Sequence, residues 1–147
     1  MLEQAAPYLP HQAPMVMIDS LVEASENHAV AKVVVTPELI FTDKNGLPTW
    51  ASIELMAQTV SLYAGVQGKK DQQPPKIGFL LGSRKMNFDF AYFPLHTEIV
   101  IKAKKNYMQD NLGLFDCEIT AMGKSITATL SVYEPDNAKQ EFQHVTK

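Results

Sequence analysis

One run of residues constrains the fold more than any other part of this chain. Residues 50–66 are good helix formers, and their apolar side chains occupy nearly every face of the helix that they would form. A helix that is apolar all round is a buried helix. Thr49 follows Pro48 and is predicted to be its N-cap. The run therefore predicts a central helix that the rest of the chain has to cover.

The other regular segments are predicted to be strands. They are either rich in β-branched residues or alternate apolar and polar side chains with a period of two. The five expected strands lie within residues 29–35, 77–90, 97–107, 113–121 and 124–133. Met122 and Gly123 should join the last two strands as a hairpin, and residues 68–76 should form an exposed connector. This order indicates an α+β fold, in which a curved antiparallel sheet wraps the helix.

Length and charge limit the class of protein. The chain has 147 residues, the usual size of one domain, and we expect a single domain over residues 1–147. Its net charge of −3 argues against nucleic acid as the main partner. The start, MLEQAAPYLPH, lacks the basic and apolar regions of a secretory signal, so we expect a cytoplasmic protein. The apolar run at residues 50–66 is interrupted by Glu54 and falls short of a membrane span.

Cysteine and motif content exclude several kinds of site. The single cysteine, Cys117, cannot form an internal disulfide or a multi-cysteine metal site, and we expect it to be a small buried side chain. The sequence has no metal-ligand constellation, phosphate-cradling glycine motif or dinucleotide fingerprint. We therefore expect no metal and no bound cofactor.

A polar stripe runs along the predicted apolar helix. Glu54, Gln58 and Ser61 are spaced i, i+4 and i+7, so they share one face. Buried polar groups must be hydrogen-bonded or must line a cavity. One interpretation is structural, with Glu54 pairing with a basic residue or capping a turn at a subunit interface. The other is functional, with Glu54 acting as an acid or base beside a substrate channel.

Three segments together carry a resemblance to a known family. They are LPHQAPMVMID at residues 9–19, LPTWASIELMAQ at 47–58 and GFLLGSRKMNF at 78–88. In this order and spacing the chain resembles the hotdog-fold 3-hydroxyacyl-acyl carrier protein dehydratases of fatty acid synthesis. It is most similar to the divergent dehydratases of aryl-polyene pigment clusters. The resemblance covers about residues 9–133 and implies dehydration of 3-hydroxyacyl thioesters to trans-2-enoyl thioesters.

The resemblance also implies an architecture and a site. In the hotdog fold a long central helix lies in a strongly curved sheet, and two subunits join their sheets with active sites between them. The family's helix carboxylate works with a histidine of the partner subunit, and a backbone N–H near the helix start binds the thioester carbonyl. Glu54 matches the carboxylate and Gln58 the accompanying glutamine, while Thr49 stands where glycine is usual. The expected substrate-binding residues are Gln58, Thr49, Trp50 and Phe79.

The family's histidine is missing from its usual place. A shorter loop, FTDKNG at residues 41–46, replaces the segment that carries it. His11 is the candidate second acid/base group, and the alternative is a satisfied turn or interface histidine. His28 and His96 are predicted to be surface residues, and His144 lies in the tail. Asp43 either supplies a second carboxylate or forms an Asx-type turn.

The implied partner is an acyl carrier protein, which presents its substrate on a phosphopantetheine arm. Because carrier proteins are acidic, basic residues should surround the site entrance. Arg84 and Lys85 are the main candidates, followed by Lys102, Lys104 and Lys105, although these could equally be a solvated strand face. Three hypotheses remain open. The first is a working dehydratase that uses Glu54 with an unusual partner group, and the second is a subunit whose active site is completed by, or belongs to, a related hotdog chain in a heteromer. The third is a hotdog thioesterase or non-catalytic acyl-binding protein, and the assembly is either a homodimer or a heteromer.

Overall fold

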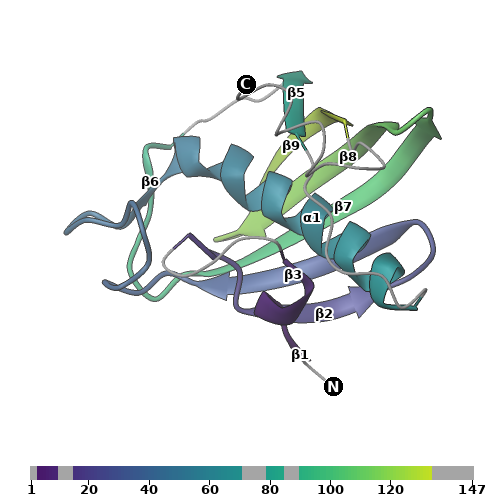
Figure 1. The fold of residues 1–147 in the computed structure, drawn as a ribbon. Coiled ribbons are helices and arrows are strands. Elements are labelled where there is room, and N and C mark those ends of the chain that lie inside the picture. Colours follow the sequence, from purple (N-terminus) through teal and green to yellow (C-terminus); the bar gives the residue numbers. More distant parts are fainter. Residues whose placement is uncertain (1–2, 10–14, 71–78, 85–89, 134–147) are drawn as a thin grey trace, which may run out of the picture.

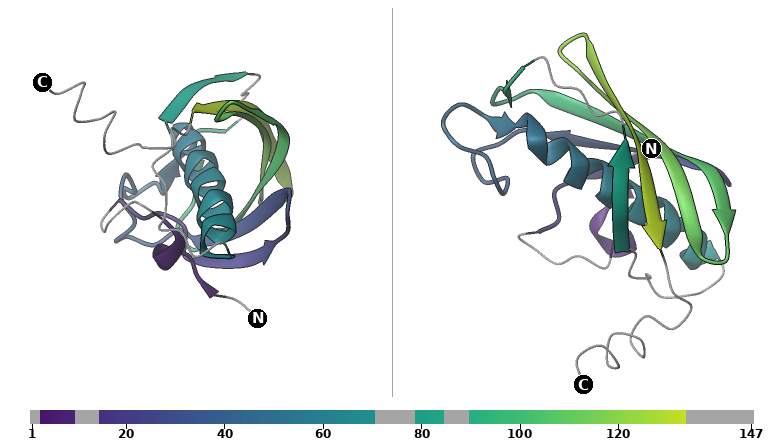
Figure 2. Two further views of the ribbon diagram at one scale, coloured as in Figure 1. Left: turned by 45° about the vertical axis from the view of Figure 1, so that its right-hand side comes forward. Right: turned by 90° about the horizontal axis from the view of Figure 1, so that it is seen from above.

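The computed structural model describes residues 3–9, 15–70, 79–84 and 90–133, with the backbone alone for residues 69–70 and 79–84. Its centre is the helix α1 (Ser52–Lys70), which continues directly from a 3₁₀ turn, η2 (Thr49–Ala51). Figure 1 shows α1 lying against the sheet, and the left view of Figure 2 looks along α1 while the strands curve around one side of it. This is the arrangement expected from the apolar helix run.

One seven-stranded antiparallel sheet forms the wrapping layer. Its strand order is β1-β2-β3-β7-β8-β9-β5, and each neighbouring pair is antiparallel. A second small sheet pairs β4 with β6. The strands are β1 (Glu3–Gln4), β2 (Ser20–Ala24), β3 (His28–Val34), β4 (Leu47–Pro48), β5 (Phe79–Arg84), β6 (Tyr92–Phe93), β7 (Glu98–Gln109), β8 (Leu112–Ala121) and β9 (Lys124–Tyr133). The five predicted strands are confirmed, whereas β1, β2, β4 and β6 were not anticipated.

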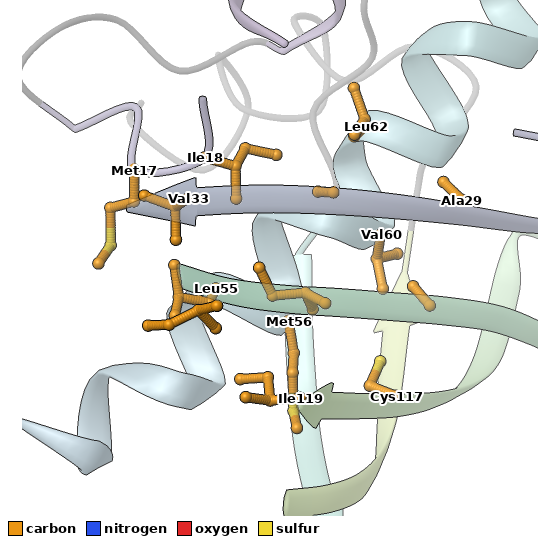
Figure 3. Packing of buried hydrophobic residues seen from close by; sticks show 14 of the residues in the cluster. Met17, Ile18, Ala29, Val33, Leu55, Met56, Val60, Leu62, Cys117 and Ile119 are labelled. Carbon is orange, nitrogen blue, oxygen red and sulfur yellow. The ribbon is translucent and has the colours of Figure 1, made fainter. Parts of the chain in front are cut away.

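The alternation predicted for the strands is the alternation of burial in the structure. Phe115, Cys117 and Ile119 of β8 are buried, and the residues between them are less buried or exposed. Their apolar side chains meet Leu55, Met56 and Val60 of α1 across a single core (Figure 3). The core also includes β3, as Figure 3 shows for Ala29 and Val33.

Two hairpin turns fix the register of the three longest strands. Met122 and Gly123 join β8 to β9 with φ angles of 55° and 69°, and Asp110 and Asn111 join β7 to β8 with 53° and 68°. Two-residue turns with both φ angles positive suit the right-handed twist of the paired strands. The predicted Met122-Gly123 hairpin is therefore confirmed.

Two details of the helix prediction were wrong. Thr49 is not the N-cap: it lies inside η2, whose N-cap is Pro48, and its hydroxyl donates to the carbonyl oxygens of Phe90 at 2.9 Å and Ala91 at 3.2 Å. The helix also continues to Lys70, so the segment predicted to be a connector begins inside it. The rest of that segment, residues 71–76, lies outside the described residues.

The second half of α1 is anchored to the N-terminal part of the chain. A short 3₁₀ turn, η1 (Ala6–Tyr8), approaches the helix so closely that a Cβ atom on Gly65 would lie 1.9 Å from the Tyr8 carbonyl oxygen. The Tyr63 hydroxyl donates to the Glu26 carbonyl oxygen, and Gln67 Nε2 donates to the Ser25 carbonyl oxygen at 2.8 Å. These contacts fix the position of α1 along its own axis, and therefore also the position of its N-terminal end.

Within the residues that the structure describes, no helix is both long enough and apolar enough to cross a membrane.

Candidate active site

The predicted polar stripe forms a hydrogen-bonded pair at the start of α1. Glu54 lies in the first turn and is half-buried, whereas Gln58, one turn later, has no exposed surface. Gln58 Nε2 donates to Glu54 Oε1 at 3.0 Å. Glu54 and Gln58 therefore share one face, as their i, i+4 spacing predicted, and the carboxylate lies at the boundary between core and surface.

Gln58 also binds the backbone of the segment that leads into β2. Its Nε2 donates to the Met15 carbonyl oxygen at 2.7 Å, and its Oε1 accepts from the Met17 N–H at 2.8 Å. A glutamine amide has two N–H hydrogens, and here both are donated to groups of this chain. Sequence reasoning included this segment in the resemblance but missed its hydrogen bonds to Gln58, because they come from main-chain groups, whose partners residue identity does not reveal.

Both polar hydrogens of Thr49 are also used within the chain. Besides the hydroxyl contacts already described, its backbone N–H donates to the Ala91 carbonyl oxygen at 3.0 Å. In a 3₁₀ turn capped by Pro48, the backbone N–H groups of Thr49 and Trp50 have no acceptor inside the turn itself. The Thr49 N–H is bound to Ala91, so of these two amides only the Trp50 N–H has no acceptor among the residues that the structure describes.

Exposed apolar side chains surround this end of α1. Trp50 is one helical turn before Glu54 and is 56% exposed, and Phe41 is 40% exposed although it is aromatic. Their ring centroids are 5.2 Å apart, and Phe41 has a φ of 72°. Positive φ is costly for a bulky residue, so the loop holds this ring against Trp50 at the expense of backbone strain. The prediction included Trp50 but missed Phe41.

The loop that replaces the family's histidine segment forms a turn. Asp43 is exposed, its Oδ1 accepts from the Asn45 N–H at 2.7 Å, and the backbones of Asp43 and Gly46 form an isolated bridge. The Asx-type turn that we considered for Asp43 is therefore present, and its carboxylate holds this turn.

The two described histidines differ in their surroundings. His28 is half-buried, with Nδ1 2.6 Å from Ser25 Oγ and Nε2 3.5 Å from Glu23 Oε2, so it is less solvated than predicted. Ser25 is bound to Gln67, thirteen residues along α1 from Glu54, which places His28 roughly 20 Å away from that carboxylate. His96 is exposed in a turn, as expected.

Several predicted site residues lie wholly or partly beyond what the structure describes. His11, Lys85 and His144 are outside the described residues. Phe79 and Arg84 are described only by their backbone, which forms the two ends of β5 and pairs with Tyr133 and Thr129 of β9.

The strand lysines lie on the outer face of the sheet. Lys102 and Lys104 are exposed and line a shallow cavity of about 370 Å³ with two carboxylates, Asp116 and Glu118. Because the lysines share this face with acidic side chains, it is not a strongly positive surface. The solvated strand face that we considered for this set fits it better than a carrier-protein patch.

Cys117 is buried behind the same strands, as expected. Burial, together with the neighbouring Asp116 carboxylate, raises the pKa of its thiol from 9.0 to about 12.

Since the thiolate is the reactive form, the native protein should react with iodoacetamide at pH 8 roughly 10³-fold more slowly than the urea-unfolded chain, as mass spectrometry would measure. The folded-state pKa is the higher one, so the stability that the protonated thiol contributes below pH 9 should be lost as the pH rises towards 12. Equally fast labelling of both forms would contradict the buried position.

Among the described residues, no group of three or more histidine, cysteine, aspartate or glutamate side chains could hold a metal ion. The site thus contains the hydrogen-bonded Glu54 carboxylate, a backbone N–H donor at the start of the helix, and the exposed aromatic rings of Trp50 and Phe41. A long helix held in a curved antiparallel sheet, with a carboxylate in its first turn, defines the class as a hotdog-fold protein with a candidate acid/base site.

Comparison with known proteins identifies the family. The model of the ApeP-like family, described as ApeP dehydratase, matches residues 3–143, so the chain belongs to this family and is a dehydratase. It is 24% identical over 131 residues to the 3-hydroxyacyl-[acyl-carrier-protein] dehydratase FabZ of Acinetobacter baylyi, covering 86% of this chain and 88% of that protein.

Solved structures agree with this assignment. A chain of the dehydratase heterocomplex ApeI:P from Xenorhabdus doucetiae superposes with a TM-score of 0.86 at 27% identity over 99% of both chains. A hypothetical thioesterase from Streptococcus pneumoniae, solved with coenzyme A, has a TM-score of 0.59 at 19% identity over 78% of this chain and 84% of that one. The second likeness concerns the fold alone.

Proposed function

We propose that this dehydratase removes water from 3-hydroxyacyl thioesters carried by an acyl carrier protein and yields trans-2-enoyl thioesters, in fatty acid or aryl-polyene type synthesis. The observation that carries the proposal is the Glu54–Gln58 pair at the start of the central helix, in a chain that matches the ApeP family almost from end to end. The activity of the FabZ relative supports the substrate class.

The elimination requires two proton transfers. A base removes the proton alpha to the thioester carbonyl, and an acid protonates the departing hydroxyl, so one water leaves and one carbon–carbon double bond forms. Glu54 performs one of these transfers, because it is the carboxylate held in the first turn of α1. The alpha proton becomes acidic only when the carbonyl oxygen is stabilised as negative charge develops on it.

The carbonyl donor in this chain is the backbone N–H of Trp50 rather than that of Thr49. The Thr49 N–H is bound to Ala91, whereas the Trp50 N–H has no acceptor in the turn and belongs to the positive end of the helix. The exposed Trp50 and Phe41 rings then contact the acyl part of the substrate, which also excludes water from the thioester. Phe79 of β5 contributes to the same acyl site.

The second proton-transferring group is His11. It lies four positions before Met15, whose carbonyl oxygen is bound to Gln58, and the Cα atoms of two residues four positions apart are separated by at most about 14 Å. A histidine supplied by a related subunit is the alternative, and a His11→Ala variant distinguishes the two.

The partners follow from the sheet and from the relatives. We propose assembly with a related hotdog subunit, because the ApeI:P relative is a heterocomplex and because β5 pairs only with β9 within the described part of the chain. A homodimer uses the same open edge. Arg84, the last residue of β5, and Lys85, which follows it in the sequence, receive the acidic carrier protein. The reaction needs no cofactor beyond the phosphopantetheine thioester. We expect it to take place in the cytoplasm.

The deciding experiment is mass spectrometry of a carrier-bound 3-hydroxyacyl substrate, with the protein alone and with a related hotdog dehydratase subunit of the same organism. We expect loss of one water, and gain of one water when the assay starts from the enoyl form. Activity that requires the second subunit establishes the heteromer, and activity of the protein alone establishes the homodimer. Release of free thiol without dehydration would instead indicate a thioesterase and overturn the proposal.

A further inference from the structure

Thr49 is bound at three points to one short segment of the chain. Its hydroxyl donates to the carbonyl oxygens of Phe90 at 2.9 Å and Ala91 at 3.2 Å, and its N–H donates to the Ala91 carbonyl oxygen at 3.0 Å. A hydroxyl has one hydrogen, so the two carbonyls share it in a three-centre hydrogen bond. The residue is only 5% exposed, which shields these bonds from competition with water.

The segment that accepts these hydrogen bonds is supported on two sides. It leads directly into β6, which pairs with β4 just before the helix start. The Phe90 ring packs edge-on against the buried Phe93 ring at a centroid distance of 5.2 Å, and Lys124 Nζ, at the start of β9, lies 5.0 Å from the centroid of the Phe90 ring. Phe90 and Ala91 therefore offer fixed acceptors to the residue that precedes Trp50.

The backbone N–H of Trp50, which we propose to bind the thioester carbonyl, depends directly on Thr49. It belongs to the planar peptide group that joins the two residues, so any rotation of the Thr49 backbone moves it. The hydrogen bonds of the Thr49 N–H and hydroxyl oppose this rotation, and a β-branched side chain has few rotamers of its own. Glycine, which is usual at this position in the dehydratases that the chain resembles, has no hydroxyl and a freer backbone. The threonine therefore adds a restraint that glycine cannot supply.

We propose that Thr49 is a positioning residue of the dehydration site, which fixes the Trp50 N–H by hydrogen-bonding η2 to the backbone of Phe90 and Ala91. The inference rests on the proposed function, because it assumes that this N–H stabilises the carbonyl oxygen in the transition state. A donor is effective only within about 2.7–3.1 Å of the developing oxyanion, so a small displacement lowers the rate. Thr49 acts through Trp50 on the chemical step and leaves substrate binding nearly unchanged.

The test compares variants with and without the hydroxyl. Thr49→Val keeps the β-branched shape and the N–H bond to Ala91, and we expect kcat to fall by about 10-fold with KM changed less than about threefold. Thr49→Ser retains the hydroxyl and should keep kcat within about threefold of native. The matched control is Thr59→Val in the same helix, because the Thr59 side chain is also buried and its hydroxyl donates to the Leu55 carbonyl oxygen at 2.8 Å. This control should lower stability towards urea and leave kcat unchanged.

Thr49→Ala supplies a second test if Thr49→Val does not fold, since it differs from Thr49→Ser only by the hydroxyl and should have about 10-fold lower kcat. All variants should be assayed with carrier-bound substrate, in the oligomeric state in which the native protein is active. Equal kcat values for the serine and alanine variants, native kcat for folded Thr49→Val, or an equal loss in Thr59→Val would overturn the inference. If Glu54→Gln is itself fully active, the proposed function fails instead.

Discussion

A Glu54→Gln variant should lose roughly 10³-fold in kcat for dehydration while folding normally, because positioned acid/base groups typically contribute 10²- to 10⁴-fold to the rate. The substitution preserves size and shape. Its side-chain oxygen can still accept the Gln58 Nε2–H, which lies 3.0 Å from Glu54 Oε1 in the native protein. What it removes is the ability to accept and return a proton. The loss should therefore appear in catalysis and not in thermal stability.

The measurement is the rate of water loss from a carrier-bound 3-hydroxyacyl substrate, together with the reverse hydration. Glu38→Gln is the matched control, since it makes the same change at an exposed position and should leave the rate within about twofold of native. Circular dichroism and a thermal melt establish that both variants are folded. If Glu54→Gln retained the native rate, Glu54 would have only a structural role in the stripe.

A Gly65→Ala variant should be destabilised by about 3 kcal/mol, at the upper end of the usual cost of overpacking a core. In an ordinary helix interior the same change stabilises by up to about 1 kcal/mol, because alanine has the higher helix propensity. Here the added Cβ would lie 1.9 Å from the Tyr8 carbonyl oxygen and 2.8 Å from its carbonyl carbon. Backbone atoms cannot rotate aside as a side chain can, so η1 must move off the helix. The sign of the change in stability is therefore the test.

Urea unfolding of Gly65→Ala should be compared with that of Gly123→Ala. Gly123 has a φ of 69° and nothing within 4 Å of an added Cβ, so its substitution introduces backbone strain without a clash and should cost only about 1 kcal/mol. A larger loss at Gly65 than at Gly123 is the expected order. A Gly65→Ala protein more stable than native would show that η1 is not docked on α1 in solution.

The sequence by itself determined the architecture. An all-round apolar helix has to be buried, and strands with period-two alternation have one face for it to pack against, so local pattern was sufficient to predict a helix within a curved sheet. The i, i+4 spacing of Glu54 and Gln58 was likewise sufficient to predict that they share one face of the helix. These features depend on residues close together in the chain, or on the physical requirement that apolar faces be covered.

Only the tertiary structure decided which donors and acceptors the site residues use. Thr49 was predicted to cap the helix, yet its hydroxyl donates to carbonyl oxygens of Phe90 and Ala91, more than forty positions away in sequence. The orientation of the Gln58 amide likewise depends on the backbone of Met15 and Met17. Main-chain N–H and C=O groups are the same in every residue apart from proline, so a sequence does not indicate which of them will face a given side chain. That choice is made when segments distant in the chain come together in the fold.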